Sequence, residues 1–218
     1  MTKPNKVLRF HEIQEFRALE PTEESGHIVE GYAIIYEERT NVGGWFMEII
    51  KRGALDGADL KDVPLFIHHQ DRKIPLARSR NNNGNSTMQL TVDNKGLHFR
   101  AELDVENNSE AKALYSAVKR EDITGMSFAF RTSEENWSDL DEELPTREII
   151  KYEKIYEISA LYSPQYDGAN INARDESLDS EDKAALDNAK SESLDNDQNE
   201  KDLELRKAIE MELINSVN

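Results

Sequence analysis

Residues 88–103 read MQLTVDNKGLHFRAEL, and this stretch does most to set the fold class of the chain. Apolar residues alternate with polar ones from Met88 to Val92 and again from Leu97 to Leu103, which is the period of a half-buried strand. The turn-forming residues Asp93-Asn94-Lys95-Gly96 separate the two runs. Gly96 is free to adopt a positive φ there. The pattern predicts a β-hairpin.

Segments of β character lie on both sides of this hairpin. Residues 28–36 (IVEGYAIIY) form a near-continuous apolar run that predicts a buried strand, and shorter candidates cover 45–50 and 63–69. Alternation returns at 123–131 and at 149–162, with an acidic loop expected over 134–145 between them.

One helix is expected between the hairpin and residue 123. Asn107 can cap its first turn, and Glu110 stands three residues later at the capping-box position. Four apolar residues then follow at helical spacing, Ala111, Leu114, Tyr115 and Val118. The sum of six or seven strands and one mid-chain helix predicts an α+β, mainly β protein, whose antiparallel sheet closes or folds on itself against packed helices.

Composition excludes several classes of function. The 218 residues carry a formal net charge of -17, which disfavours a nucleic-acid binder that relies on a basic surface. No apolar run reaches the length of about 18 residues that a membrane-spanning helix needs, and no secretory signal is visible at the N-terminus. The absence of cysteine excludes disulfides, thiolate zinc sites and a cysteine nucleophile, and it fits a reducing cytoplasm.

Charge and composition predict that the chain has three parts. Residues 175–218 hold 14 acidic and 5 basic side chains and no aromatic residue. We expect a main domain over 1–173, an acidic disordered linker over 174–200, and a short amphipathic helical tail over 201–218. A helix this short is marginal alone in water, so the tail is either a helix with a partner or a frayed, solvated end.

The first candidate catalytic residue is Ser127. If 123–130 is a strand, Met126, Phe128 and Phe130 share a bulky apolar face, whereas Gly125, Ser127 and Ala129 share the other. A nucleophilic serine needs such a clearing, because the substrate carbonyl must come within about 3 Å of its hydroxyl. Taken alone, the pattern fits better a serine that packs against a close neighbour.

Two further segments supply possible partners for that hydroxyl. His68 and His69 end an apolar run, where a histidine can be oriented by its neighbours and still reach a cleft as a general base. Glu157 lies on the face of its strand opposite Ile158 and Ala160, where a carboxylate can fix the tautomer of a histidine. In isolation, these residues read as a partly exposed histidine pair and a solvated glutamate.

Other chemistries lack support in the sequence. Adjacent histidines on a strand point to opposite faces, and no other pattern completes a metal site. A glycosidase carboxylate pair has no accompanying aromatic cluster, because Trp45 and Trp137 are isolated. Gly43-Gly44 lacks the strand-loop-helix context of a phosphate-binding loop. We expect neither a metal nor a cofactor.

The ordered set of short motifs between residues 12 and 173 resembles the prohead (capsid maturation) protease family of tailed phages. The motifs run, in order, through Gly31-Tyr32-Ala33, Phe46-Met47-Glu48, Gly53-Ala54-Leu55, Leu65-Phe66-Ile67 with His69, Pro75-Leu76-Ala77-Arg78, Gly125-Met126-Ser127-Phe128, Glu157-Ile158-Ser159-Ala160-Leu161 and the Pro164–Ala173 segment. The family is similar to the herpesvirus assembly proteases. The resemblance therefore implies a closed or partly closed antiparallel β-barrel with surrounding helices.

The same resemblance implies a serine endopeptidase. Ser127 matches the family's nucleophile and His69 its base, and Glu157 is our choice for the third, orienting member, a role that a second histidine fills in the herpesvirus enzymes. Where the family commonly has Asn before its histidine and Asp after it, this chain has His68 and Gln70. The donors of an oxyanion hole are expected among backbone N–H groups near Ser127 or at Arg131.

The implied substrates are the capsid and scaffold proteins of the phage, and the enzyme itself. It would act inside the immature capsid (prohead) in the host cytoplasm, and it would self-associate or bind scaffold segments through its tail, with no nucleic-acid or membrane partner. The alternative is a catalytically inactive capsid-assembly or scaffolding protein with the same fold.

Overall fold

The structure is a computed structural model that describes residues 7–12, 15–23, 25–162, 182–195, 201 and 207. The chain divides into two compact units, Met1–Ala173 and Arg174–Asn218. The described part of the first unit holds eleven strands, one α-helix and a short 3-10 helix at Arg80–Asn82. The strands are β1 (Val7–Glu12), β2 (Arg17–Leu19), β3 (His27–Ile35), β4 (Arg39–Val42), β5 (Phe46–Ile50), β6 (Pro64–Ile67), β7 (Ala77–Arg78), β8 (Met88–Val92), β9 (Gly96–Leu103), β10 (Gly125–Ser138) and β11 (Thr146–Leu161), and the helix is α1 (Ser109–Lys119).

The strands form two sheets, so the α+β, mainly β class is confirmed. A seven-stranded sheet runs β1-β10-β11-β5-β4, and β6 joins it by pairing with both β11 and β7. A four-stranded antiparallel sheet runs β2-β3-β9-β8. The expected closed antiparallel barrel is not found: β11 pairs in parallel with both β5 and β6, and no pairing among the described strands closes either sheet.

The hairpin predicted at 88–103 is present as β8 and β9. Gly96 begins β9 with a φ of 156°. A Cβ added at this position would lie 1.9 Å from the backbone oxygen of Ile34 on β3. The glycine is therefore required as much by the close approach of β3 as by the turn.

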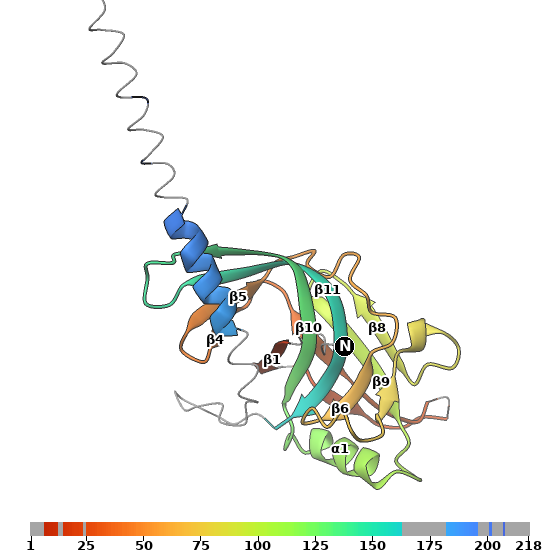
Figure 1. The fold of residues 1–218 in the computed structure, drawn as a ribbon. Helices are drawn as coiled ribbons and strands as arrows, with labels where there is room; N and C mark the ends of the chain where they lie inside the picture. Colours follow the sequence, from red (N-terminus) through yellow and green to blue (C-terminus); the bar gives the residue numbers. More distant parts are fainter. Residues whose placement is uncertain are drawn as a thin grey trace, which may run out of the picture. The chain divides into compact units, whose positions relative to one another are not determined.

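The two longest strands, β10 and β11, run side by side through the molecule (Figure 1). Their bulky faces enter one hydrophobic core together with residues of the four-stranded sheet and of α1, including Phe99, Leu114, Phe128 and Ile158. The strands extend further than their apolar patterns indicated. β10 continues to Ser138 and pairs with β11 from Thr146 onward, so the expected loop over 134–145 is a shorter connection.

Helix α1 lies at one end of the sheets (Figure 1) and buries the four apolar residues that the helical spacing predicted. Its cap differs by one residue from the expected one. The side chain of Asn108 accepts hydrogen bonds from the backbone N–H groups of Glu110 and Ala111, at 2.9 and 3.3 Å. The amide of Asn107 instead donates to Asp104 at 3.0 Å.

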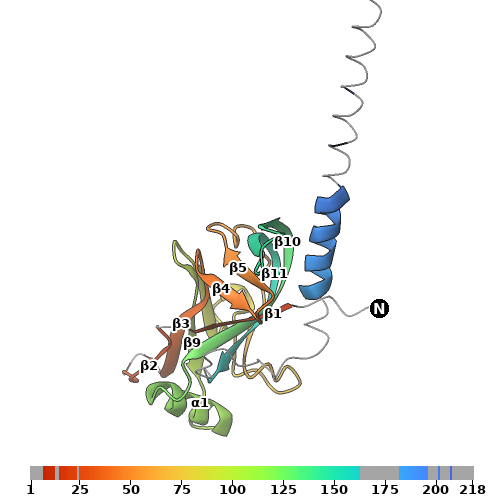
Figure 2. The ribbon, with the colours of Figure 1, turned by 90° about the vertical axis from the view of Figure 1, so that its left-hand side faces the viewer.

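In the second unit, residues 182–195 are helical (Figure 2). These residues lie within the segment expected to be a linker, and their helical conformation fits their alanine, leucine and lysine content, since these residues favour helices. The remaining linker and the expected tail helix fall outside the described residues, except for positions 201 and 207. No helix in the described part of the chain is long and apolar enough to cross a membrane.

Candidate active site

Three strands of the seven-stranded sheet place the candidate residues. In the antiparallel register of β10 and β11, Ser127 lies opposite Ser159, and Ala129 lies opposite Glu157. Directly opposed residues project to the same face of a sheet, so Ser127 and Glu157 share one face.

His69 lies just after the end of β6, which runs parallel to β11 with Ile67 opposite Ala160. β6 ends at Ile67, and the backbone N–H of Gln70 bonds back to the Ile67 carbonyl at 3.2 Å, which closes a tight turn. His68 and His69 occupy its centre with φ values of 51° and 54°. This left-handed conformation costs a non-glycine residue roughly 1–3 kcal/mol, and such strain gathers at functional sites.

The turn brings His69 between the other two side chains. Its Nε2 atom lies 2.7 Å from Ser127 Oγ, and its Nδ1 atom lies 2.7 Å from Glu157 Oε1. A carboxylate only accepts hydrogen bonds, so Nδ1 carries the proton and donates it to Glu157. The lone pair of Nε2 then faces the serine hydroxyl, as acceptance of its proton requires.

Burial differs along this chain of hydrogen bonds. Ser127 is 2% exposed and the Glu157 side chain 5%, whereas the His69 side chain is 22% exposed. A buried carboxylate interacts strongly with a partner because little water screens it. The buried carboxylate of Glu157 therefore orients His69, whose side chain remains partly exposed to solvent.

His68 does not reach the serine. Its ring packs edge-on against Tyr162, with 5.2 Å between ring centroids. Burial, together with the neighbouring His69, lowers the pKa of His68 below its usual 6.5. Of the two adjacent histidines, His69 is therefore the one that contacts Ser127.

A fourth residue, Ser159, lies within the same cluster. Its fully buried hydroxyl donates to Glu157 Oε1 at 3.4 Å and accepts the backbone N–H of His69 at 3.3 Å. It therefore links the turn that carries the histidine to the carboxylate that orients it. The alternation placed Ser159 on the face of Glu157, but no sequence signal indicated a contact with the turn after β6.

A buried ion-pair network lies on the other face of this sheet and was not predicted. Arg9 on β1 donates two hydrogen bonds to Glu48 on β5, at 2.6 and 2.8 Å, and Arg147 on β11 donates to the same carboxylate at 3.3 Å. Arg147 also binds Glu135 at 3.1 Å. The network connects β1 to β5 and, through Glu48, to Arg147 on β11.

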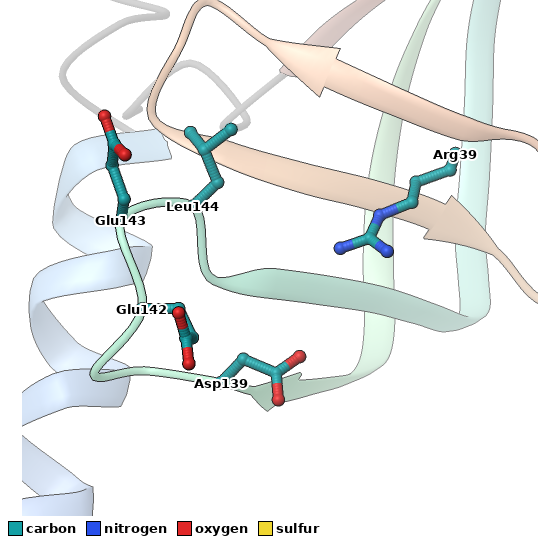
Figure 3. Close-up of a pocket in the computed structure, with 5 residues that line it drawn as sticks. All are labelled: Arg39, Asp139, Glu142, Glu143 and Leu144. Carbon is teal, nitrogen blue, oxygen red and sulfur yellow. The ribbon is translucent and has the colours of Figure 1, made fainter.

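Two other features do not contribute to the site. The guanidinium of Arg131, one of the expected oxyanion donors, is paired with Glu153. An open pocket at the loop between β10 and β11 is lined by Arg39, Asp139, Glu142, Glu143 and Leu144, and by none of the three candidate residues (Figure 3). Within the described residues, no group of three or more histidine, aspartate or glutamate side chains could hold a metal ion.

A serine, a histidine and a carboxylate hydrogen-bonded in series form the arrangement of the serine hydrolases. The sequence assigns the chain more narrowly, since the caudovirus prohead serine protease family matches residues 14–184. The chain therefore belongs to this family, and β1 precedes the matched residues.

The chain was also compared with solved structures and with curated proteins. The capsid assembly protease gp21 of bacteriophage T4 is a structural neighbour with a TM-score of 0.41 and 12% sequence identity, covering 73% of this chain and 100% of the T4 chain. Among curated proteins no match was found.

Proposed function

We propose that this chain is a serine endopeptidase that cleaves the capsid and scaffold proteins of its phage, and itself, during maturation of the prohead. The observation that carries the proposal is the pair of 2.7 Å contacts of His69, one to Ser127 and one to Glu157. Membership of a prohead serine protease family points to the same chemistry.

The proposed reaction is acyl transfer. His69 accepts the Ser127 proton while Oγ bonds to the carbonyl carbon of a substrate peptide, and Glu157 stabilises the resulting imidazolium. The imidazolium then protonates the leaving amine as the C–N bond breaks. Water, deprotonated by His69, releases the acyl group and restores the serine.

The test uses self-cleavage of the full chain and cleavage of a purified capsid-protein precursor, both followed by intact mass. We expect the chain to produce shortened products and Ser127→Ala to produce none. Ser133→Ala is the matched control, because it removes an exposed serine from the same strand and should leave cleavage unchanged. Identical fragments from Ser127→Ala would assign the cleavage to a contaminating protease.

One observation favours the inactive alternative, a capsid-assembly or scaffolding protein with the same fold. Ser127 is almost fully buried, so the resting structure does not admit a substrate carbonyl. Intact chains and an uncleaved precursor after long incubation would support this alternative.

The segment after residue 174 is proposed to tether the enzyme inside the assembling shell. Its charge suits a solvated linker, and a short amphipathic helix can dock in a groove of a partner helix bundle. Deletion of 175–218 should reduce incorporation into assembling shells. Normal incorporation would remove the tether from the proposal.

A further inference from the structure

Strand β1 lies directly beside the candidate nucleophile. It is an edge strand of the seven-stranded sheet and pairs antiparallel with Gly125–Phe130 of β10, with Phe10 opposite Ser127. The backbone that carries the nucleophile is therefore already paired, on the side away from β11, with a segment of the same chain.

The contact extends to the hydroxyl itself. Ser127 Oγ lies 2.6 Å from the backbone carbonyl oxygen of Arg9 and 2.7 Å from His69 Nε2. A hydroxyl has one proton to donate, and both neighbours are acceptors when Nδ1 carries the imidazole proton. The Arg9 carbonyl therefore competes with the base for the proton that catalysis must move.

The same arrangement closes the site to substrate. A reacting carbonyl must come within about 3–3.5 Å of the nucleophile. The carbonyl of Arg9 occupies that surrounding space, and Ser127 is 2% exposed. A peptide can reach the hydroxyl only after β1 has moved.

We propose that the edge of β10 over Gly125–Phe130 is a peptide-binding edge and that β1 is its intramolecular occupant. An extended peptide takes the place of β1 by pairing with β10, and its carbonyl replaces that of Arg9 beside Ser127. The inference rests on the proposed peptidase function, and it adds where the substrate chain lies and what holds the site closed.

The anchor of β1 is the buried Arg9–Glu48 ion pair. The Arg9 guanidinium donates two hydrogen bonds to Glu48 and lies 5.7 Å from the Phe46 ring centroid and 5.6 Å from that of Phe130. When β1 leaves, Glu48 keeps the guanidinium of Arg147. The buried carboxylate therefore still has a positively charged partner after β1 has left. For this reason the strand can be released reversibly without unfolding of the sheet.

The first test locks β1 in place. Leu8 and Ala129 are opposed in the register, so their Cα atoms lie about 4.5–5.5 Å apart, within disulfide range. The chain has no cysteine of its own, so Leu8→Cys with Ala129→Cys makes a single bridge. The single variants are controls for each cysteine, and circular dichroism checks the fold.

Access to Ser127 is measured with a fluorophosphonate probe. Its phosphorus bonds to Oγ, fluoride leaves, and His69 takes the serine proton. We expect the oxidised double variant to be labelled at least about tenfold more slowly than the same protein after reduction, because the disulfide blocks the opening of β1. Equal labelling rates in the two states would overturn the inference.

A second variant changes the rate in the opposite direction. Arg9→Lys keeps the positive charge but loses the two-pronged contact with Glu48, so it should loosen β1 and speed labelling about threefold or more. A synthetic peptide with the sequence of residues 7–12 should slow labelling of this variant by occupying the vacated edge. Labelling of Arg9→Lys no faster than the parent, or a peptide without effect, would contradict the proposal.

Failure of the proposed function gives a different result. If the parent, the reduced double variant and Arg9→Lys all fail to react while remaining folded, Ser127 is not an activated nucleophile, and both proposals fall together. If all forms react at one rate, the peptidase proposal survives and β1 is not its gate.

Discussion

At the scale of single residues, Glu157 is proposed to act through the histidine that it binds rather than through contact with substrate. Its carboxylate accepts a hydrogen bond from Nδ1–H of His69 at 2.7 Å, and Nε2 of the same ring lies 2.7 Å from Ser127 Oγ. Glu157→Gln can present an N–H to Nδ1 and favour the wrong tautomer. We expect kcat for peptide cleavage to fall about 10²–10⁴-fold while KM changes little. An unchanged kcat would remove Glu157 from the site.

Ser159 is a positioning residue in this account. Ser159→Ala removes its two bridging contacts at the turn and the carboxylate, so kcat should fall about three- to tenfold at constant KM. Ser159→Thr retains a hydroxyl and should recover part of the loss. The pH profile of kcat/KM should shift in Ser159→Ala, because the base is less firmly oriented. A change in thermal stability alone, with an unaltered profile, would indicate a purely structural serine.

The residue patterns predicted part of this site. The alternation of apolar and polar residues predicted that Ser127 and Glu157 each lie on the face of their strand opposite the apolar side chains. The register of β10 and β11 places both residues on one face of the sheet. The pattern did not choose between His68 and His69, because that choice depends on a turn whose left-handed φ values leave no mark in hydropathy. The roles of the three residues in catalysis stay predictions until an activity is measured.

At the scale of elements, the β8–β9 hairpin depends on one glycine. A side chain at Gly96 would collide with the Ile34 backbone, which no rotamer change can relieve. Gly96→Ala should therefore lower the free energy of unfolding by about 3 kcal/mol, as measured in urea. Gly84→Ala is the control, because a Cβ there meets nothing within 4 Å. Equal effects of the two substitutions would contradict the close approach of β3.

Element types were easier to predict than their pairing. Alternation predicted β8, β9, the first half of β10 and most of β11, and helical spacing predicted the buried face of α1. The parallel pairing of β11 with β5 and β6 joins residues about 90 positions apart, such as Leu65 and Ile158. Local propensity carries no information about such pairs, so the mixed sheet was not predicted.

At the scale of the whole molecule, stability should fall in acid. Glu30 on β3 joins three strands of the second sheet through Arg17 on β2 and Arg100 on β9. Burial would raise the pKa of Glu30, but the hydrogen bonds and charges of the two arginines outweigh it and hold the pKa below its usual 4.5. Its contribution is therefore present above pH 4.5 and is lost as pH falls through the folded-state pKa.

Glu30→Gln removes this contribution. We expect a lower Tm at pH 7 and a smaller fall in Tm between pH 5 and pH 3 than in the parent, followed by circular dichroism. Glu102→Gln, at an exposed carboxylate on β9, is the control and should retain the parent's pH dependence. A parallel decline of Glu30→Gln and the parent would show that Glu30 does not set the acid response.

Charge and composition predicted a boundary at residues 173–174, where the acidic segment begins, and the domain roles on either side of it stay predictions. The composition did not predict the helix at 182–195, because the high acidic content of this segment is typical of disorder even though several of its residues favour helices. The strand pattern predicted a sheet that closes or folds on itself, and the family resemblance made this a closed or partly closed barrel, but the described strand pairings do not contain a closed barrel.

The central claim is that His69 makes Ser127 reactive. The most direct measurement is peptide mapping by mass spectrometry after fluorophosphonate treatment of the parent and of folded His69→Ala. The account predicts one adduct, on Ser127, in the parent and none in the variant. An adduct on a different serine, or equal modification of Ser127 in both proteins, would contradict it.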